Sequence, residues 1–98
     1  MYLTPYIPQI RKLCEAHKVG RLYAFGSALT ERFTDESDID MIVDFNKETV
    51  EDYFLNYYDF KYSLEELLDR KVDLLEEQAI KNPYFRQNID RYKQLIYE

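Results

Sequence analysis

Five residues of this chain have the types and spacing of a metal-assisted phosphate site: the pair Gly26-Ser27 and three aspartates, Asp38, Asp40 and Asp73. Gly26-Ser27 follows a short apolar run and begins a polar turn, where backbone N–H groups can bind a phosphate. Asp38 and Asp40 lie two residues apart at the start of another apolar run. Because side chains two apart on a strand project from one face, this pair could bind a divalent cation.

The third aspartate completes a set that suits phosphoryl or nucleotidyl transfer. A hard cation such as Mg²⁺ is usually held by one or two carboxylates together with oxygens of the substrate phosphates. In these reactions the protein mainly positions the reactants and stabilises charge. Asp73 lies between apolar residues of a third strand-like run, which predicts an outward carboxylate that acts as a metal ligand or a base. The expected cofactor is therefore Mg²⁺, with Mn²⁺ as an alternative.

Each of these residues also has a plainer interpretation when it is taken alone. Ser27 could only cap a helix, since serine is a preferred N-cap. Asp38 could belong to a solvated acidic loop, and Asp40 could be a charge at a strand edge. Asp73 follows two basic residues and could simply balance them on an exposed surface. The combination at these spacings favours the phosphate site over the separate interpretations.

Hydrophobic periodicity predicts alternating helices and strands that would position these residues. Apolar residues at helical spacing, with Thr4 as a cap and Pro5 at the first helical position, predict a first helix that runs to Gly20. Segment 93–97 could extend a helix or form a closing strand, and we favour the strand. The other expected elements are a strand at 21–25, a short helix at 28–32, a strand at 39–45, a long helix at 49–68, a strand at 71–75, and a helix from 82 to about 90 that packs through Phe85 and Ile89.

Length and composition fit one α/β domain that spans residues 1–98. Ninety-eight residues provide one modest core, and a hydrophobic share of 46% is ordinary for a globular chain. The sequence has neither an apolar run long enough for a membrane span nor a signal-peptide pattern, so a cytoplasmic location without membrane contact is expected. The formal charge of −6 argues against stable binding of nucleic acid. A small nucleotide bound through a metal remains compatible with it.

Several residues are expected to be structural. Cys14 is the single cysteine and lies in a helical pattern, which predicts a buried side chain. The single histidine, His17, lacks the partners that a zinc site or a Ser-His-Asp triad would need. One segment contains four tyrosines, which either anchor a protein interface or, as we favour, pack on the core with their hydroxyls at the surface. These are Tyr53, Tyr57, Tyr58 and Tyr62.

Three segments together carry a family resemblance. They are Phe25-Gly26-Ser27, then Ser37-Asp38-Ile39-Asp40-Met41-Ile42-Val43, then Arg70-Lys71-Val72-Asp73-Leu74-Leu75. They resemble the minimal nucleotidyltransferases (MNT domains) of the DNA polymerase β superfamily, and segments 81–85 and 94–97 resemble the ends of these small proteins. The resemblance implies a polymerase β-like α/β (α+β) fold, with a small mixed sheet flanked by helices. MNT domains usually occur beside a HEPN-domain toxin, as the antitoxin of a toxin–antitoxin pair.

The resemblance also implies roles for the five site residues. Gly26 and Ser27 would bind the nucleotide phosphates, and Asp38 and Asp40 would bind Mg²⁺. Asp73 would complete the metal site and help to activate the acceptor hydroxyl. The implied reaction is transfer of AMP from ATP to a tyrosine of the HEPN toxin, which silences the toxin.

One position departs from the family pattern. Many relatives have an Arg-Gly pair shortly after the Gly-Ser pair, whereas this chain has Thr30-Glu31. Arg32 lies close by and is the candidate for a substitute contact to the triphosphate.

Two other functions stay open from the sequence. The chain could be a binding antitoxin that neutralises its partner by complex formation without catalysis, or it could transfer nucleotides to a small molecule. Three acids around one point repel each other unless a metal is bound, which favours the enzyme. The acceptor, the nucleotide preference and the choice between a homodimer and a hetero-oligomer are not set by the sequence.

Overall fold

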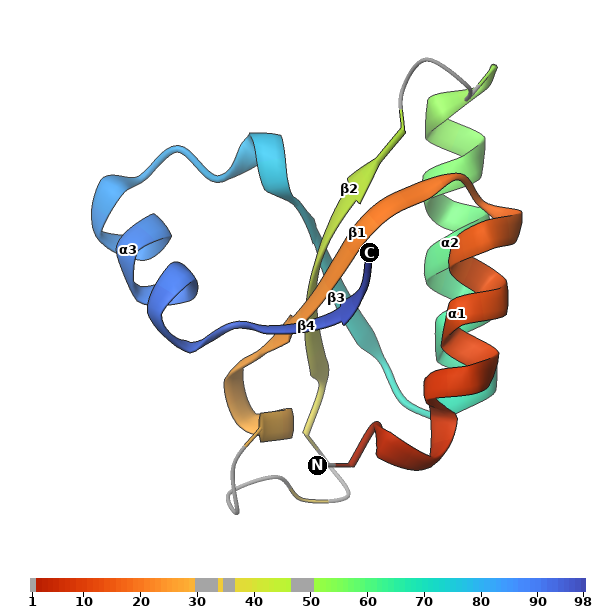
Figure 1. Ribbon diagram of the computed structural model, residues 1–98, viewed down its shortest axis with the longest axis horizontal. Helices are drawn as coiled ribbons and strands as arrows, with labels where there is room; N and C mark the ends of the chain where they lie inside the picture. Colours follow the sequence, from red (N-terminus) through yellow and green to blue (C-terminus); the bar gives the residue numbers. More distant parts are fainter. Residues whose placement is uncertain (1, 30–33, 35–36, 47–50) are drawn as a thin grey trace.

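The computed structural model describes residues 2–29, 34, 37–46 and 51–98. The elements are the 3₁₀ turn η1 (Thr4–Tyr6), α1 (Ile7–Ala16), β1 (Val19–Phe25), the 3₁₀ turn η2 (Gly26–Leu29), β2 (Ile39–Phe45), α2 (Tyr53–Leu68), β3 (Val72–Glu76), the 3₁₀ turn η4 (Glu77–Ala79), α3 (Pro83–Tyr92) and β4 (Gln94–Tyr97). The strands form one sheet in the order β3-β2-β1-β4. Helices α1 and α2 cover one face, and α3 lies on the other side (Figure 1). This mixed sheet flanked by helices confirms the expected fold class.

The sheet is mixed because α2 carries the chain from β2 to β3 as a crossover. Strand β1 pairs antiparallel with β2 and β4, whereas β2 and β3 are parallel and therefore need such a connection. Asp52 caps α2 by accepting a hydrogen bond from the backbone N–H of Leu55 at 3.1 Å. The helix ends at Leu68, and the next residue, Asp69, has a left-handed φ of 52°. From there the chain returns directly into β3.

Some element boundaries differ from those expected. The chain begins with a 3₁₀ turn that has no side-chain cap, so the prediction of Thr4 as a cap was wrong. Helix α1 ends at Ala16, and β1 already begins at Val19, because Lys18 takes a positive φ of 61° that breaks the helix. The short helix expected at 28–32 corresponds to η2 only in part, and its remaining residues lie outside those described. The closing strand expected near the end is confirmed as β4.

The main core lies between the sheet and the helices α1 and α2. Cys14 is fully buried in it, as expected, and burial raises the pKa of its thiol to about 12. His17 is also buried, where its ring nitrogens hydrogen-bond the Leu13 carbonyl at 2.7 Å and the Asp59 carboxylate at 2.8 Å. The core also contains Ile39, Met41 and Val43 of β2, Phe60, Leu64 and Leu68 of α2, Leu22 and Ala24 of β1, and Val72 and Leu74 of β3.

The opposite side of the sheet, which we call the open face, carries the intervening side chains of each strand. In β2 these are Asp40, Ile42 and Asp44, because strand residues alternate between faces. Helix α3 packs here through the buried Ile89, and the ring centroids of Phe25 and Phe85 are 6.5 Å apart. Both residues expected to pack this helix on the domain therefore do so, although Phe85 remains 43% exposed. None of the described helices has both the length and the apolar character that a membrane crossing requires.

Candidate active site

Three neighbouring strands bring Gly26, Asp40 and Asp73 into one row. Asp40 of β2 is the register partner of Asp73 of β3, so their Cα atoms are about 4.8 Å apart, the usual spacing of adjacent strands. On its other side Asp40 is paired with Phe25, the last residue of β1. Gly26 follows directly. The two predicted carboxylates, separated by more than thirty positions in the chain, therefore lie side by side on the open face.

Both the backbone conformation at position 26 and the lack of room for a side chain there require glycine. Its φ is +75°, a conformation that side-chain-bearing residues rarely adopt. A Cβ atom built there would lie 2.5 Å from Oδ2 of Asp40, closer than real atoms approach. The backbone of η2 therefore begins in direct contact with the Asp40 carboxylate. Ser27 is the next residue of this turn.

The electrostatics of the row disfavour the ionised form of Asp40. Asp40 is half-buried, and burial raises the pKa of its carboxyl, followed by the negative charges of Asp73 and Asp38. Asp38 and Asp73 are exposed, and Asp38 immediately precedes β2. A bound cation would relieve this repulsion.

The donor set suits a cation that is shared with a substrate. Within the described part of the chain, no three acidic, histidine or cysteine side chains converge closely enough to cage a metal ion by themselves. Mg²⁺ rarely needs such a cage, since it is usually bound by one or two carboxylates, waters and substrate phosphates. Asp40, with Asp73 beside it and Asp38 two residues before it, fits that pattern.

Arg70 holds the segment that leads into Asp38. Its Nη1 atom donates hydrogen bonds to the backbone carbonyls of Thr34 at 2.7 Å and Ser37 at 3.1 Å. The guanidinium also lies 5.0 Å from the ring centroid of Tyr2, which favours a fixed orientation. In the sequence, Arg70 stands out only as a positive charge near Asp73. A cation placed directly before a predicted strand is a weak signal for such a contact.

We expect Arg70→Met to lower nucleotidyl transfer about 10- to 100-fold, since small displacements of a catalytic group have effects of this size. The methionine keeps the apolar stem beside Tyr2 but loses both hydrogen bonds, each of which contributes roughly 1 kcal/mol or more. The loss should fall on kcat more than on the KM for the nucleotide. Steady-state kinetics of the variant, with Lys71→Met at the exposed neighbouring residue as the matched control, measure this effect. Equal kinetics in the two variants would contradict a positioning role for Arg70.

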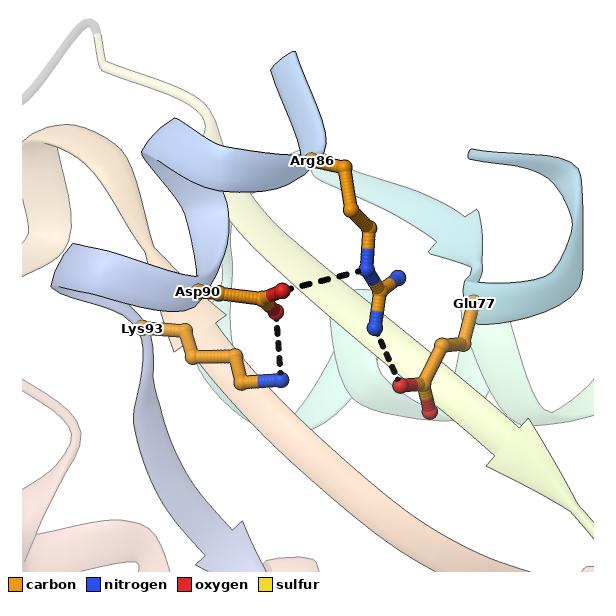
Figure 2. Close-up of polar contacts among 4 residues, drawn as sticks. All are labelled: Glu77, Arg86, Asp90 and Lys93. Carbon is orange, nitrogen blue, oxygen red and sulfur yellow. Dashed lines mark hydrogen bonds and ion pairs between the residues drawn. The ribbon is translucent and has the colours of Figure 1, made fainter. Parts of the chain in front are cut away.

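A series of ion pairs connects the segments that lie on the open face around α3 (Figure 2). Arg86 of α3 contacts Glu77 of η4 at 2.7 Å and Asp90 at 3.3 Å. Asp90 in turn pairs with Lys93 at 2.9 Å. Lys93 lies 4.2 Å from the ring centroid of Tyr23, on the open face of β1. The network therefore connects η4, α3 and the start of β4.

The four tyrosines of α2 divide between packing and exposure. Tyr53 donates a hydrogen bond to Glu76 at 2.8 Å, and Tyr57 donates one to the Leu74 carbonyl at 2.5 Å. Both therefore pack on the sheet with their hydroxyls bonded to β3 rather than at the surface. Tyr58 and Tyr62 form an aromatic pair with centroids 5.8 Å apart, and Tyr62 is 57% exposed.

Of the residues predicted for the site, the structure brings together Gly26, Asp40 and Asp73, with Asp38 at the entry to β2. Ser27 is placed by its backbone in η2. Arg32 lies outside the described residues, so its contact with a triphosphate stays a prediction.

The chain belongs to the family described as nucleotidyltransferase domain, which matches residues 8–96. Two candidate protein adenylyltransferases of Methanocaldococcus jannaschii are 40% and 36% identical to it over 85 residues. Each alignment covers 87% of this chain and 82% of the relative. The general reaction is therefore nucleotidyl transfer.

Solved structures agree with this assignment. A candidate minimal nucleotidyltransferase aligns with a TM-score of 0.77 and 27% identity, over 94% of this chain and 90% of that chain. A toxin–antitoxin structure with AMP-PNP aligns with a TM-score of 0.70 and 23% identity, over 92% of this chain and 71% of that chain. The structure of a tri-AMPylated Shewanella oneidensis HEPN toxin in complex with an MNT antitoxin aligns with a TM-score of 0.65 and 22% identity, over 98% of this chain and 71% of that chain. The last two are likenesses of fold, and together these findings confirm the resemblance to minimal nucleotidyltransferases.

Proposed function

We propose that this chain transfers AMP from ATP to a tyrosine hydroxyl of a HEPN-type toxin and thereby acts as its antitoxin. The observation that carries the proposal is the register pairing of Asp40 with Asp73, in contact with the Gly26 turn. The names of the Methanocaldococcus relatives support protein adenylylation. The AMPylated toxin in complex with a similarly folded MNT antitoxin supports the partner.

Asp38, Asp40 and Asp73 would hold the divalent cation that nucleotidyltransferases of this family generally use, and Mg²⁺ is the expected ion. When bound, it supplies positive charge that offsets the charge developing on the phosphates. The crowding of carboxylates around the half-buried Asp40 supports this assignment.

The chain's own residues would then orient the reactants. Backbone N–H groups at Gly26 and Ser27 would bind the phosphates of ATP, and Arg32 is a candidate for a further phosphate contact. Asp73 would accept the proton of the acceptor hydroxyl. The acceptor oxygen forms a bond to the α-phosphorus while the bond between the α- and β-phosphates breaks, and pyrophosphate leaves.

Incubation with α-labelled ATP, Mg²⁺ and the product of the neighbouring gene, which the proposal expects to be a HEPN protein, tests the proposal. We expect label on a tyrosine of the HEPN protein, and its loss in the Asp38→Ala/Asp40→Ala double variant. Asp44→Ala is the matched control, because Asp44 is a half-buried acid on the same face of β2 but lies away from the row. No label, together with a stable complex that still inhibits the HEPN protein, would establish a binding antitoxin instead.

The remaining expectations accompany this proposal. A cytoplasmic location, the absence of nucleic-acid binding and a hetero-oligomer with the toxin or a homodimer stay predictions. Size measurement of the purified chain with and without the HEPN protein would decide the assembly.

A further inference from the structure

A hollow of about 310 Å³ lies beside β3, the strand that carries Asp73. We call it the β3 hollow. Its apolar wall consists of Leu75 from β3, Ala79 at the end of η4, Ile80 directly after η4, and Phe85 from α3. Figure 1 shows the curve that the chain makes here, from β3 through η4 to α3, away from the sheet.

The β3 hollow begins close to the row of site residues. Leu75 is two residues after Asp73 on the same strand and so shares its face, about 6.6 Å further along. Leu75 is paired with Ile42, as Asp73 is paired with Asp40. The hollow therefore continues the open face beyond the edge of the carboxylate row.

The order of the row fixes which reactant comes from which side. Gly26 directly follows β1, Asp40 lies on the neighbouring strand β2, and Asp73 lies on the edge strand β3. In an in-line displacement the attacking and leaving oxygens lie on opposite sides of the phosphorus. If the triphosphate tail lies at the Gly26 turn, the acceptor hydroxyl must approach from the side of Asp73. That is the side of the β3 hollow.

We propose that the β3 hollow binds the aromatic ring of the acceptor tyrosine and directs its hydroxyl to Asp73. This inference rests on the proposed function, because it assigns a place to the acceptor of that reaction. The hollow then selects a tyrosine over a serine or threonine, because their short side chains make no contact with the apolar wall.

The chemistry of the lining suits a phenol ring better than the adenine of ATP. Three polar residues belong to the lining: Lys81 is exposed, and the other two already hold internal hydrogen bonds. Glu76 accepts from Tyr53 at 2.8 Å and from Gln78 at 3.1 Å, and the Asn82 side-chain oxygen accepts from the backbone of Tyr84 and Phe85 at the start of α3. Adenine carries several polar atoms that need partners, whereas tyrosine carries one hydroxyl, which leaves the hollow toward Asp73.

The first experiment separates acceptor binding from nucleotide binding. In Ile80→Ala and Phe85→Ala we expect kcat/KM for the HEPN acceptor to fall about tenfold or more, since each variant removes apolar contacts to the ring. The affinity for AMP-PNP with Mg²⁺ should stay within about twofold. Leu95→Ala is the matched control, because Leu95 is a comparably exposed apolar residue on β4, the opposite edge of the sheet. A parallel loss of AMP-PNP affinity would overturn the proposal and assign the hollow to the base.

A second experiment does not depend on turnover. N-acetyl-tyrosinamide is titrated into the protein with Mg²⁺ and AMP-PNP, and methyl resonances of Leu75 and Ile80 are followed by NMR, with N-acetyl-serinamide as the control. Saturable shifts of these methyls with the tyrosine probe alone support the hollow, even if the HEPN protein is not an acceptor. Shifts confined to other residues, or none, overturn it even if transfer to the HEPN protein occurs.

Discussion

Asp40→Asn is expected to remove nucleotidyl transfer while it makes the metal-free protein more stable. The loss of activity should be about 10²–10³-fold, because charge stabilisation by a bound cation is worth several kcal/mol and each 1.4 kcal/mol is a factor of ten. The gain in stability should be about 1 kcal/mol, the size of the repulsion between carboxylates at a hydrated surface. For a chain of this length that corresponds to a Tm increase of about 4–8 °C.

The pH dependence of this gain follows from the direction of the pKa shift. Burial, Asp73 and Asp38 raise the pKa of Asp40 in the folded state above its ordinary value. The stability contributed by its protonated form is therefore complete at pH values below the ordinary pKa and is lost as the pH rises through the folded pKa. The Tm difference between variant and wild type should be largest near pH 7 and should vanish once the pH falls below the ordinary pKa of a carboxyl group. Thermal melts in EDTA measure it, with Asp44→Asn as the control, and a variant that is less stable than wild type at pH 7 would contradict the repulsion.

Gly26→Ala is expected to reduce transfer about 10²-fold and to destabilise the fold. A positive φ at a residue with a Cβ atom costs about 1–2 kcal/mol. The new methyl group would also lie 2.5 Å from Oδ2 of Asp40, so the carboxylate must move. Displacement of a catalytic group by about 1 Å can reduce activity by two orders of magnitude. Kinetics and denaturant unfolding of the variant measure the two effects.

Comparison with Gly26→Asn separates the two causes. Asparagine tolerates positive φ better than alanine but has the same Cβ atom. If contact with Asp40 controls activity, both variants lose transfer equally while Gly26→Asn is the more stable. If backbone strain controls it, Gly26→Asn recovers most of the activity, and the contact with Asp40 is not the reason for glycine at this position.

Local patterns in the sequence predicted the strands of the site well. The apolar run at 39–45 predicted β2 with its observed bounds, and the positions of Asp38 before it and Asp40 within it followed from that. The apolar run around Asp73 predicted β3 to within one residue at each end. These elements could be predicted because the face of each residue depends only on its position along its own strand.

Contacts between distant segments could not be predicted in this way. Periodicity does not say which strands are neighbours or in which register, and the pairing of Asp40 with Asp73 depends on the whole α2 crossover. A glycine after a strand is also explained by an ordinary turn, so its contact with Asp40 left no signal in the sequence. Arg70 bonds backbone carbonyls, which every residue has, and no residue type marks Thr34 and Ser37 as its partners.

The row of site residues and helix α3 are held in the fold by different interactions. Asp40 and Asp73 lie on strands whose other face is part of the main core, so opening the row also disturbs that core. Helix α3 buries a single side chain, Ile89, and is held further by the ring contact of Phe85 with Phe25 and by the ion pairs around Arg86 (Figure 2). Partly exposed ion pairs hold weakly and are screened by salt. Local opening of α3 can therefore move the wall that would meet a protein acceptor while the row of site residues stays folded.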